Sequence, residues 1–486
     1  MRIIGNRGNT ARKVQAVASG ALASGDTVIV NADGTVSVVA PTTEAIGLPV
    51  VYSTGRETYT AAAYDSNAQK VVIVFSDQAG SFYGKAVVGT VSGTSISFGT
   101  IVVFNSGTTT EKAICFDSDN NKVVIAYDDA SNSGAGTAIV GTVSGTSISF
   151  GTEAVFDSGG NGIVLRNFPI AYDANSQKVV ISYYISVTGG QDGKAVVGTV
   201  SGTSISFGTP VIYNSGPTWS SEPVYDTNAQ KVVICYRDND SGNQGTAKVG
   251  TISGTSISFG SASVFDSGGI TSVSTAYDIN AQKIVIGYTQ DNTNRHSAAV
   301  VGTVSGTSIS FGTPVNVHTS YNDHVNLAYD SDAQKIAFVY PDGDNSDYGT
   351  LKFGTVSGTS ISIGSAIVFA QTTVSFDAVV YDSGTKRLVM AYEDVGNSED
   401  GTAVVYRAAV ATNLTAENYI GIASNGYATG QAATINAKGF IDDNQSSLTA
   451  GQSYYVQTNG DLGLTAADPS VFAGTAVSAT KLIVKG

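Results

Sequence analysis

This chain of 486 residues has few of the residues that form disulfides, kink the backbone or bind metal ions. It contains two cysteines, three histidines, nine prolines and one tryptophan. Cys115 and Cys235 lie in different copies of a sequence repeat, so we expect two apolar thiols rather than a disulfide. No His-x-x-x-His or Cys-x-x-Cys pair is present, which excludes the common spacings of a zinc site.

Long apolar runs, amphipathic helical patterns and positive charge are also scarce. No segment approaches the length of a membrane span, and the first residues lack the apolar core of an export signal. The formal net charge of −14 argues against a general affinity for nucleic acid or for anionic membranes, and the lack of a membrane span argues against membrane insertion. We interpret the basic residues near the start as a solvated terminus, with an arm that docks on an acidic partner as the alternative. These residues are Arg2, Arg7, Arg12 and Lys13.

Glycine, valine, threonine and serine are abundant, and they form a repeat. The phrase Gly-Thr-Val-Ser-Gly-Thr-Ser-Ile-Ser-Phe-Gly-Thr recurs almost unchanged every 52 residues, with one insertion of five. Its copies start at Gly89, Gly141, Gly198, Gly250, Gly302 and Gly354. A repeat of this length, rich in short strands and tight turns, is typical of one blade of a β-propeller.

A second sequence motif occurs once in each repeat, and we number these repeats 1 to 7. An aspartate after Tyr or Phe is followed five residues later by a basic residue. The pairs are Asp65–Lys70, Asp117–Lys122, Asp173–Lys178, Asp226–Lys231, Asp278–Lys283, Asp330–Lys335 and Asp382–Arg387. We expect each aspartate to fix its turn through bonds to the backbone, because surface ion pairs contribute only about 0–1 kcal/mol. The sequence therefore predicts an all-β fold with a seven-bladed propeller.

Each repeat predicts four strands. In repeat 1 they cover residues 59–64, 70–75, 85–91 and 95–104, with a glycine hairpin between the last two. Repeat 7 shows only three, over residues 374–381, 387–392 and 402–409. We predict that residues 43–53 supply its missing outer strand and close the ring, because an open ring leaves unpaired edges. Residues 418–423 are the alternative closing strand.

Outside the ring the chain carries a duplication. Residues 22–36 and 448–462 share a leucine, a glycine, a valine and an Asp-Gly or Asn-Gly hairpin signal. One copy precedes the ring and the other follows it. We therefore predict that residues 1–41 and 412–486 fold together as a small split β base, into which the propeller of residues 42–411 is inserted. The base is the expected site of homo-oligomer contacts, since it buries little core alone.

The sequences of the base and of the repeats resemble those of structural proteins of tailed bacteriophages. Residues 414–423, 448–456 and 476–484 look like a module of such proteins, and the repeat phrases are similar to those of predicted tail-fibre or virion-surface proteins. The resemblance covers nearly the whole chain. It implies a structural protein on the virion surface, in the capsid or the tail, assembled in the host cytoplasm with other virion proteins as partners. It carries no catalytic residues over to this sequence.

Divergence between repeats indicates a working face. The Asp–Lys turns and the Ser-Gly-Thr turns barely change, whereas the connections at the opposite face vary in length and residues. This favours a recognition surface over neutral drift, because binding residues concentrate in loops on a rigid scaffold. Aromatic rings beside acids and amides suit sugar stacking, so we predict a host-surface glycan as ligand. The predicted ligand-binding residues are Trp219, Tyr83, Tyr348, Tyr321, Asp238 and Asp342. For Trp219 the alternative is a loop cap packed on a neighbour.

Metal and enzyme sites are less well supported. Residues 237–243 and 342–347 have the oxygen-rich side chains that calcium needs but not an EF-hand's spacing, so we predict no cofactor, with calcium as the alternative. A glycosidase needs two carboxylates about 5–10 Å apart, and no pair stands out, although Glu222 lies near Trp219. We predict a non-enzymatic glycan-binding virion protein. The alternatives are a glycan-cleaving enzyme with two carboxylates in a central pocket, and a purely stabilising capsid decoration.

Overall fold

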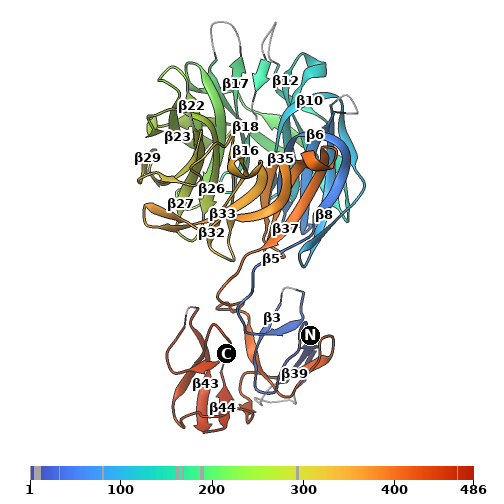
Figure 1. The fold of residues 1–486 in the computed structure, drawn as a ribbon, viewed down its shortest axis with the longest axis vertical. Helices are drawn as coiled ribbons and strands as arrows, with labels where there is room; N and C mark the ends of the chain where they lie inside the picture. Colours follow the sequence, from blue (N-terminus) through green and yellow to red (C-terminus); the bar gives the residue numbers. More distant parts are fainter. Residues whose placement is uncertain are drawn as a thin grey trace. The chain divides into compact units, whose positions relative to one another are not determined.

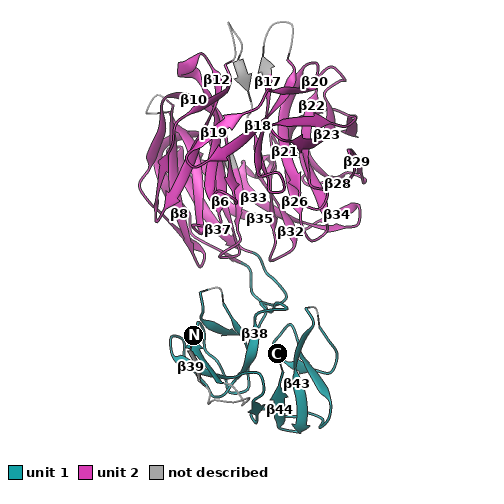
Figure 2. Cartoon of the chain, turned by 180° about the vertical axis from the view of Figure 1, so that it is seen from behind, with its two compact units in different colours: residues 1–44, 408–486 teal, residues 45–407 magenta. Residues whose placement is uncertain are grey.

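The computed structural model describes residues 2–4, 13–31, 33–78, 82–158, 164–166, 169–186, 191–291, 295–467 and 469–485. The chain divides into two compact units, each built almost entirely of β-strands (Figure 1). Unit 1 comprises residues 1–44 and 408–486, and unit 2 comprises residues 45–407 (Figure 2). Within the described ranges the helices are three 3-10 turns, too short to span a bilayer. They are η1 (Ala130–Asn132), η2 (Gly343–Asn345) and η3 (Val395–Asn397).

Unit 2 consists of antiparallel hairpins that recur along the chain. In each repeat a first strand pairs with a second strand and places the repeated aspartate opposite the basic residue. The first strands are β6 (Val50–Asp65), β10 (Val102–Asp117), β16 (Ile170–Asp173), β21 (Thr218–Asp226), β26 (Ile270–Asp278), β31 (Asn326–Asp330) and β35 (Ile367–Asp382). The second strands are β7 (Lys70–Asp77), β11 (Lys122–Asp129), β17 (Lys178–Ser186), β22 (Lys231–Asp238), β27 (Lys283–Gln290), β32 (Lys335–Asp342) and β36 (Arg387–Asp394). In repeat 3, β15 (Val164–Arg166) also pairs with β17.

A third strand and an outer strand complete each repeat. The third strands are β8 (Tyr83–Ser92), β12 (Ala135–Ser144), β18 (Gly193–Ser201), β23 (Gln244–Ser253), β28 (Ser297–Ser305), β33 (Tyr348–Ser357) and β37 (Asp400–Arg407). The outer strands begin with β9 (Ser95–Phe98), β13 (Ser147–Phe150), β19 (Ser204–Phe207), β24 (Ser256–Phe259), β29 (Ser308–Phe311) and β34 (Ser360–Ile363). They continue in β14 (Ala154–Asp157), β20 (Val211–Asn214), β25 (Ser263–Asp266), β30 (Val315–Asn316) or the opening residues of β10 and β35. These are repeated four-stranded units, as the sequence predicts.

The predicted single outer strand over residues 95–104 is wrong in one respect, because the strand is interrupted after Phe98. The break falls at a close contact with the next repeat. A Cβ atom on Gly99 would lie 1.8 Å from the carbonyl oxygen of Thr146, in the Ser-Gly-Thr hairpin of the next repeat. Gly208 meets Thr255 in the same way at 1.9 Å. Only glycine allows this approach, so the Phe-Gly-Thr wording is a packing requirement between neighbouring repeats.

The Asp–Lys turns hold their shape through backbone hydrogen bonds, as predicted. Asp226 Oδ1 accepts hydrogen bonds from the N–H groups of Asn228 and Ala229 at 2.9 and 2.8 Å. The aspartates of the other repeats bond to their own turns in this way. Among the ion pairs of the described residues, none joins such an aspartate to the basic residue of its own turn. The repeated aspartates therefore stabilise their turns through backbone hydrogen bonds rather than through ion pairs.

Pairs of packed side-chain rings occupy the junctions between repeats. A fully buried ring near the end of each second strand packs against a ring from the preceding outer strand, with centroids 5.1–5.7 Å apart. The pairs are Tyr52–Phe75, Phe104–Tyr127, Phe156–Tyr183, Tyr213–Tyr236, Phe265–Tyr288, His318–Tyr340 and Phe369–Tyr392. Both cysteines are free thiols, and Cys235 is fully buried in this core.

Residues at the start of unit 2 complete repeat 7. β5 (Ala45–Ile46) and the opening residues of β6 pair with β37, with Ile46 opposite Tyr406 and Val51 opposite Thr402. The prediction that residues 43–53 supply this strand is confirmed. The alternative, residues 418–423, forms part of unit 1 instead.

Unit 1 contains one strand arrangement twice. Its sheets have the orders β4-β3-β38-β39-β2-β1 and β42-β41-β43-β44-β40. The first consists of β1 (Arg2–Ile4), β2 (Lys13–Val17), β3 (Thr27–Val30), β4 (Val36–Val38), β38 (Tyr419–Ala423) and β39 (Ala432–Asn436). The second consists of β40 (Ile441–Asp442), β41 (Ser453–Val456), β42 (Leu462–Gly463), β43 (Val471–Ser478) and β44 (Lys481–Val484). The duplicated segments, residues 22–36 and 448–462, contain the β3–β4 and β41–β42 hairpins.

The duplication extends to an irregularity in the sheets. Each copy has a bulge beside a glycine, at Gly421 opposite Val28 and at Gly474 opposite Tyr454. Unit 2 lies in the chain between β4 and β38, which corresponds to the short connection between β42 and β43 in the second copy.

Candidate functional site

Because the strands of each repeat alternate in direction, the connections between them fall at two opposite ends of the strands. The Asp–Lys turns and Ser-Gly-Thr hairpins lie at one end of the strands, whereas the second-to-third connections and the outer-to-first connections lie at the other. We call this second end the variable rim. All six predicted ligand-binding residues lie on it: Trp219, Tyr83, Tyr348, Tyr321, Asp238 and Asp342.

Trp219 is an exposed ring held in a fixed position. It lies near the start of β21, is 42 % exposed, and stacks on Tyr184 of repeat 3 with centroids 5.9 Å apart and planes inclined by 15°. Its indole N–H donates to Gln191 Oε1 at 3.3 Å, and the guanidinium of Arg237 lies 5.9 Å from the ring centre. The residue therefore combines both interpretations, an exposed platform and a ring packed on a neighbour.

Tyr321 has a matching environment two repeats further along. It is 48 % exposed, its hydroxyl donates to Asp323 Oδ1 at 2.8 Å, and the guanidinium of Arg295 lies 6.0 Å from its ring centre. Arg295 Nη1 also lies 3.1 Å from Asp323 Oδ1. The hydrogen bond to Asp323 raises the pKa of Tyr321, so its hydroxyl stays protonated at neutral pH.

An arginine and an aspartate accompany Trp219 as well. Arg237 Nη2 lies 3.4 Å from Asp291 Oδ2, which also accepts a hydrogen bond from Asn243 at 2.9 Å. We call the sets Trp219–Arg237–Asp291 and Tyr321–Arg295–Asp323 the aromatic–arginine groups. Burial lowers the pKa of Arg237, Asp291 opposes that change, and the charge of nearby Arg295 adds to it. Because the charge of Arg295 acts on Arg237, the two groups are neighbours on the rim, and together we call them the aromatic–arginine row.

The remaining predicted residues divide between this row and a distant repeat. Asp238 lies beside Trp219 in repeat 4, because it pairs with Thr218 across β21 and β22. Asp342 and Tyr348 face each other across β32 and β33 in repeat 6, the repeat next to Tyr321. Tyr83, 36 % exposed, lies in repeat 1. The structure thus gathers five predicted residues into repeats 4 to 6 and leaves Tyr83 apart.

A central cavity is the second feature with chemical potential. It has a volume of about 270 Å³, and all seven repeats line it. Each contributes the residue four positions before its repeated aspartate. These residues are Ala61, Ala113, Pro169, Glu222, Ser274, Asn326 and Ala378. The polar members of this set come from repeats 4, 5 and 6, and Thr60, Glu111 and Lys112 add polar groups from repeats 1 and 2.

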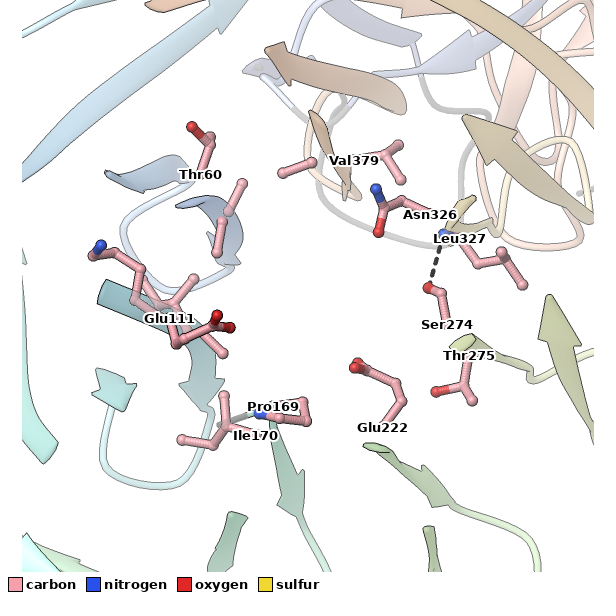
Figure 3. Close-up of a pocket in the computed structure, with 16 residues that line it drawn as sticks. Thr60, Glu111, Pro169, Ile170, Glu222, Ser274, Thr275, Asn326, Leu327 and Val379 are labelled. Atoms are coloured by element: carbon pink, nitrogen blue, oxygen red, sulfur yellow. Dashed lines mark hydrogen bonds between the residues drawn. The ribbon is translucent and has the colours of Figure 1, made fainter. Parts of the chain in front are cut away.

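Two glutamates direct their carboxylates into this cavity (Figure 3). Burial raises the pKa of Glu222 to about 8, so at neutral pH it is mostly protonated. Glu111 lies at a bulge of β10 with a φ of 40°, a left-handed conformation that side chains other than glycine rarely adopt. Bulges re-aim side chains and are frequent beside functional sites. The neighbouring Lys112 is buried, which lowers its pKa to about 7.

Sequence reasoning missed Arg295, Asp291, Asp323 and Glu111. One signal could have found the arginines. Between residues 167 and 386 the chain has only two of them, Arg237 and Arg295, and both lie at the variable rim. The bulge that aims Glu111 inward leaves no such trace in the sequence.

No protein family model and no curated protein sequence matches the chain. Among solved structures, BP39L lectin from Burkholderia pseudomallei is similar, with a TM-score of 0.52 and 10 % identity, over 74 % of this chain and 99 % of the lectin. The repeated units are consistent with a β-propeller.

Two further similar structures have lower TM-scores. A protein of unknown function from Dyadobacter fermentans reaches 0.45 at 9 % identity, over 80 % of this chain and 99 % of that protein. Sqt1 from Saccharomyces cerevisiae reaches 0.42 at 10 % identity, over 74 % of this chain and 98 % of Sqt1. At these identities the likeness concerns the propeller fold alone.

Proposed function

We propose that unit 2 is a closed seven-bladed propeller whose variable rim binds glycans, without enzymatic activity, and that unit 1 attaches it to a larger particle. The pairing of β37 with β5 and β6 supports closure. So does the hydrogen bond from the Gly384 N–H of repeat 7 to the Tyr64 hydroxyl of repeat 1, at 3.1 Å. A cavity lined by every repeat is the expected centre of such a ring.

The aromatic–arginine row is the observation that carries glycan binding. Ring faces match the apolar face of a pyranose, while guanidinium and carboxylate groups bond its hydroxyls or an acidic substituent. Trp219 and Tyr321 are exposed, and each has an arginine and an aspartate beside it. The lectin's name is consistent with this use of a propeller, although the likeness itself concerns only the fold.

Replacing Trp219 should test this function directly. We expect Trp219→Ala to weaken glycan binding at least tenfold, about 1.4 kcal/mol or more, because a central aromatic anchor is lost. The measurement is a glycan array with the full chain, followed by titration of the strongest hit. Tyr83→Ala is the matched control, since Tyr83 is another exposed rim aromatic but lies outside the row. Equal binding by all three proteins would contradict the proposal, and no binding by any of them would favour pure decoration.

For unit 1 we propose attachment to a virion, with contacts to capsid or tail proteins and to further copies of this chain. The resemblance of residues 414–423, 448–456 and 476–484 to modules of tailed-phage structural proteins supports this role. Many copies on one particle would convert weak binding at each rim into avidity. Antibodies against the chain should label intact particles of the phage that encodes it, and labelling confined to free protein would refute the attachment.

A second candidate function, glycan cleavage, is favoured by the two inward glutamates of the cavity. Glu222 would be the proton donor and Glu111 the second carboxylate. If so, Glu222→Gln should abolish hydrolysis of any bound glycan while leaving binding at the rim intact. Because Glu222 is protonated below a pKa of about 8, the activity should fall as the pH rises through about 8. Product analysis by mass spectrometry checks this, and intact glycan after long incubation with the unaltered protein would exclude cleavage.

A further inference from the structure

One junction between repeats is chemically different from the others. At six of the seven ring contacts both partners are Phe or Tyr, but at the junction of repeats 5 and 6 the ring packed on Tyr340 belongs to His318. His318 is only 8 % exposed. Its Nε2 lies 3.2 Å from Asp342 Oδ1, yet it makes no hydrogen bond to any described residue. A buried imidazole nitrogen is thus aimed at a carboxylate without the alignment of a hydrogen bond.

A second carboxylate completes the cluster. Nitrogen of His318 and carboxylate oxygens of Asp342 and Asp344 all lie within 4.8 Å of one another. Bonds of about 2.0–2.2 Å to one metal ion would separate such ligands by about 3–4 Å, so a small movement suffices. Asp344 is exposed at the rim, Asp342 is half-buried and His318 is buried.

Turn chemistry explains only one of these three residues. Asp342 accepts a hydrogen bond from the Asp344 N–H at 3.2 Å and begins the 3-10 turn η2. Repeats 2 and 7 build the same turn, after Asp129 and Asp394. The residue two positions later is Ser131 or Gly396 there, and the facing outer-strand ring is phenylalanine. The extra carboxylate and the imidazole therefore occur together at the one junction of repeats 5 and 6, and the shared turn needs neither.

We propose that His318, Asp342 and Asp344 bind a divalent metal ion of the zinc or manganese class. One imidazole nitrogen with two carboxylates suits such ions, whereas calcium prefers an all-oxygen set. The positive charge of Lys352 acts on the same imidazole, and its ammonium group is held 2.7 Å from the Val317 carbonyl oxygen.

The site would also shape the rim, although the proposal does not depend on glycan binding. A Cβ atom on Gly343 would lie 2.5 Å from the carbonyl oxygen of Tyr321, so η2 packs directly on the segment that presents this ring. Three protein ligands leave coordination positions for water or for a hydroxyl of a bound molecule.

The test is calorimetric titration of the full, untagged chain with Zn²⁺, Mn²⁺ and Ca²⁺ after chelator treatment. We expect one site per chain for Zn²⁺ or Mn²⁺, with Ca²⁺ at least tenfold weaker. Asp344→Ser should weaken binding at least tenfold, and because Asp344 is exposed and serine occupies this place in repeat 2, the variant should fold normally. His318→Phe should abolish binding while its ring keeps the contact with Tyr340.

His296→Gln is the control for adventitious binding by a histidine outside the cluster, and it should bind as the unaltered protein does. Thermal unfolding without metal verifies that each variant is folded, and unfolding with metal should show a rise in Tm that both cluster variants lose. Absence of Zn²⁺ and Mn²⁺ binding by the unaltered chain, or unchanged binding by folded Asp344→Ser, would overturn the proposal.

Discussion

A fragment that spans residues 54–407 should fail to fold, whereas one that spans residues 45–407 should unfold cooperatively. The nine additional residues provide the only described outer strand of repeat 7, paired with β37. They include Tyr52, which is buried against Phe75 and Phe98. Loss of such a ring alone costs about 3–5 kcal/mol. With the unpaired edge added, this loss consumes much of a stability of about 5–15 kcal/mol.

Circular dichroism and urea unfolding of the two fragments measure this effect. The shorter fragment should be insoluble or should lack a cooperative transition. Equal unfolding midpoints for both would mean that residues 45–53 are not a structural part of the ring.

The second large effect concerns the glycines between repeats. Gly208→Ala should destabilise the chain by about 3 kcal/mol or more, because its Cβ atom would lie 1.9 Å from the Thr255 carbonyl oxygen and the two repeats would have to separate. Gly364 is the matched control, since it occupies the same place in repeat 6 but faces no such hairpin. A Cβ atom there would meet nothing nearer than 3.4 Å, so Gly364→Ala should cost less than about 1 kcal/mol.

Urea unfolding of both glycine variants beside the unaltered chain gives the comparison. Similar losses at the two positions would show that glycine serves backbone freedom there rather than packing between repeats.

Much of the fold could be predicted because short local sequence motifs determine it. The Asp–Lys turns, the Ser-Gly-Thr hairpins and the alternation of apolar strands recur in each repeat, and each is determined by contacts within the repeat or with its neighbour. The closing strand could be predicted because residues 45–53 resemble the outer strands. The interruption after Phe98 could not, since Gly99 lies against Thr146 of the next repeat, a contact between distant parts of the chain.

The candidate site was predictable only in outline. Divergence of the connections identified the rim and its exposed rings. Asp323 is near Tyr321 in the chain, but other members of the two groups come from different repeats. Arg237 and Asp291 are 54 residues apart, and they meet because neighbouring repeats bring them together. His318 and Asp342 are joined in the same way. The inward turn of Glu111 depends on a backbone bulge, which depends in turn on pairing between whole strands.

The single tryptophan offers the most direct measurement of the central claim. Because Trp219 is the only tryptophan in the chain, tryptophan fluorescence, excited selectively over that of the tyrosines, reports on the aromatic–arginine row alone. Titration with the strongest array hit should change the emission of Trp219 along a saturable curve, with the same dissociation constant that calorimetry gives. Calorimetric binding of that glycan with no change in the emission would place the recognition site elsewhere and contradict the account.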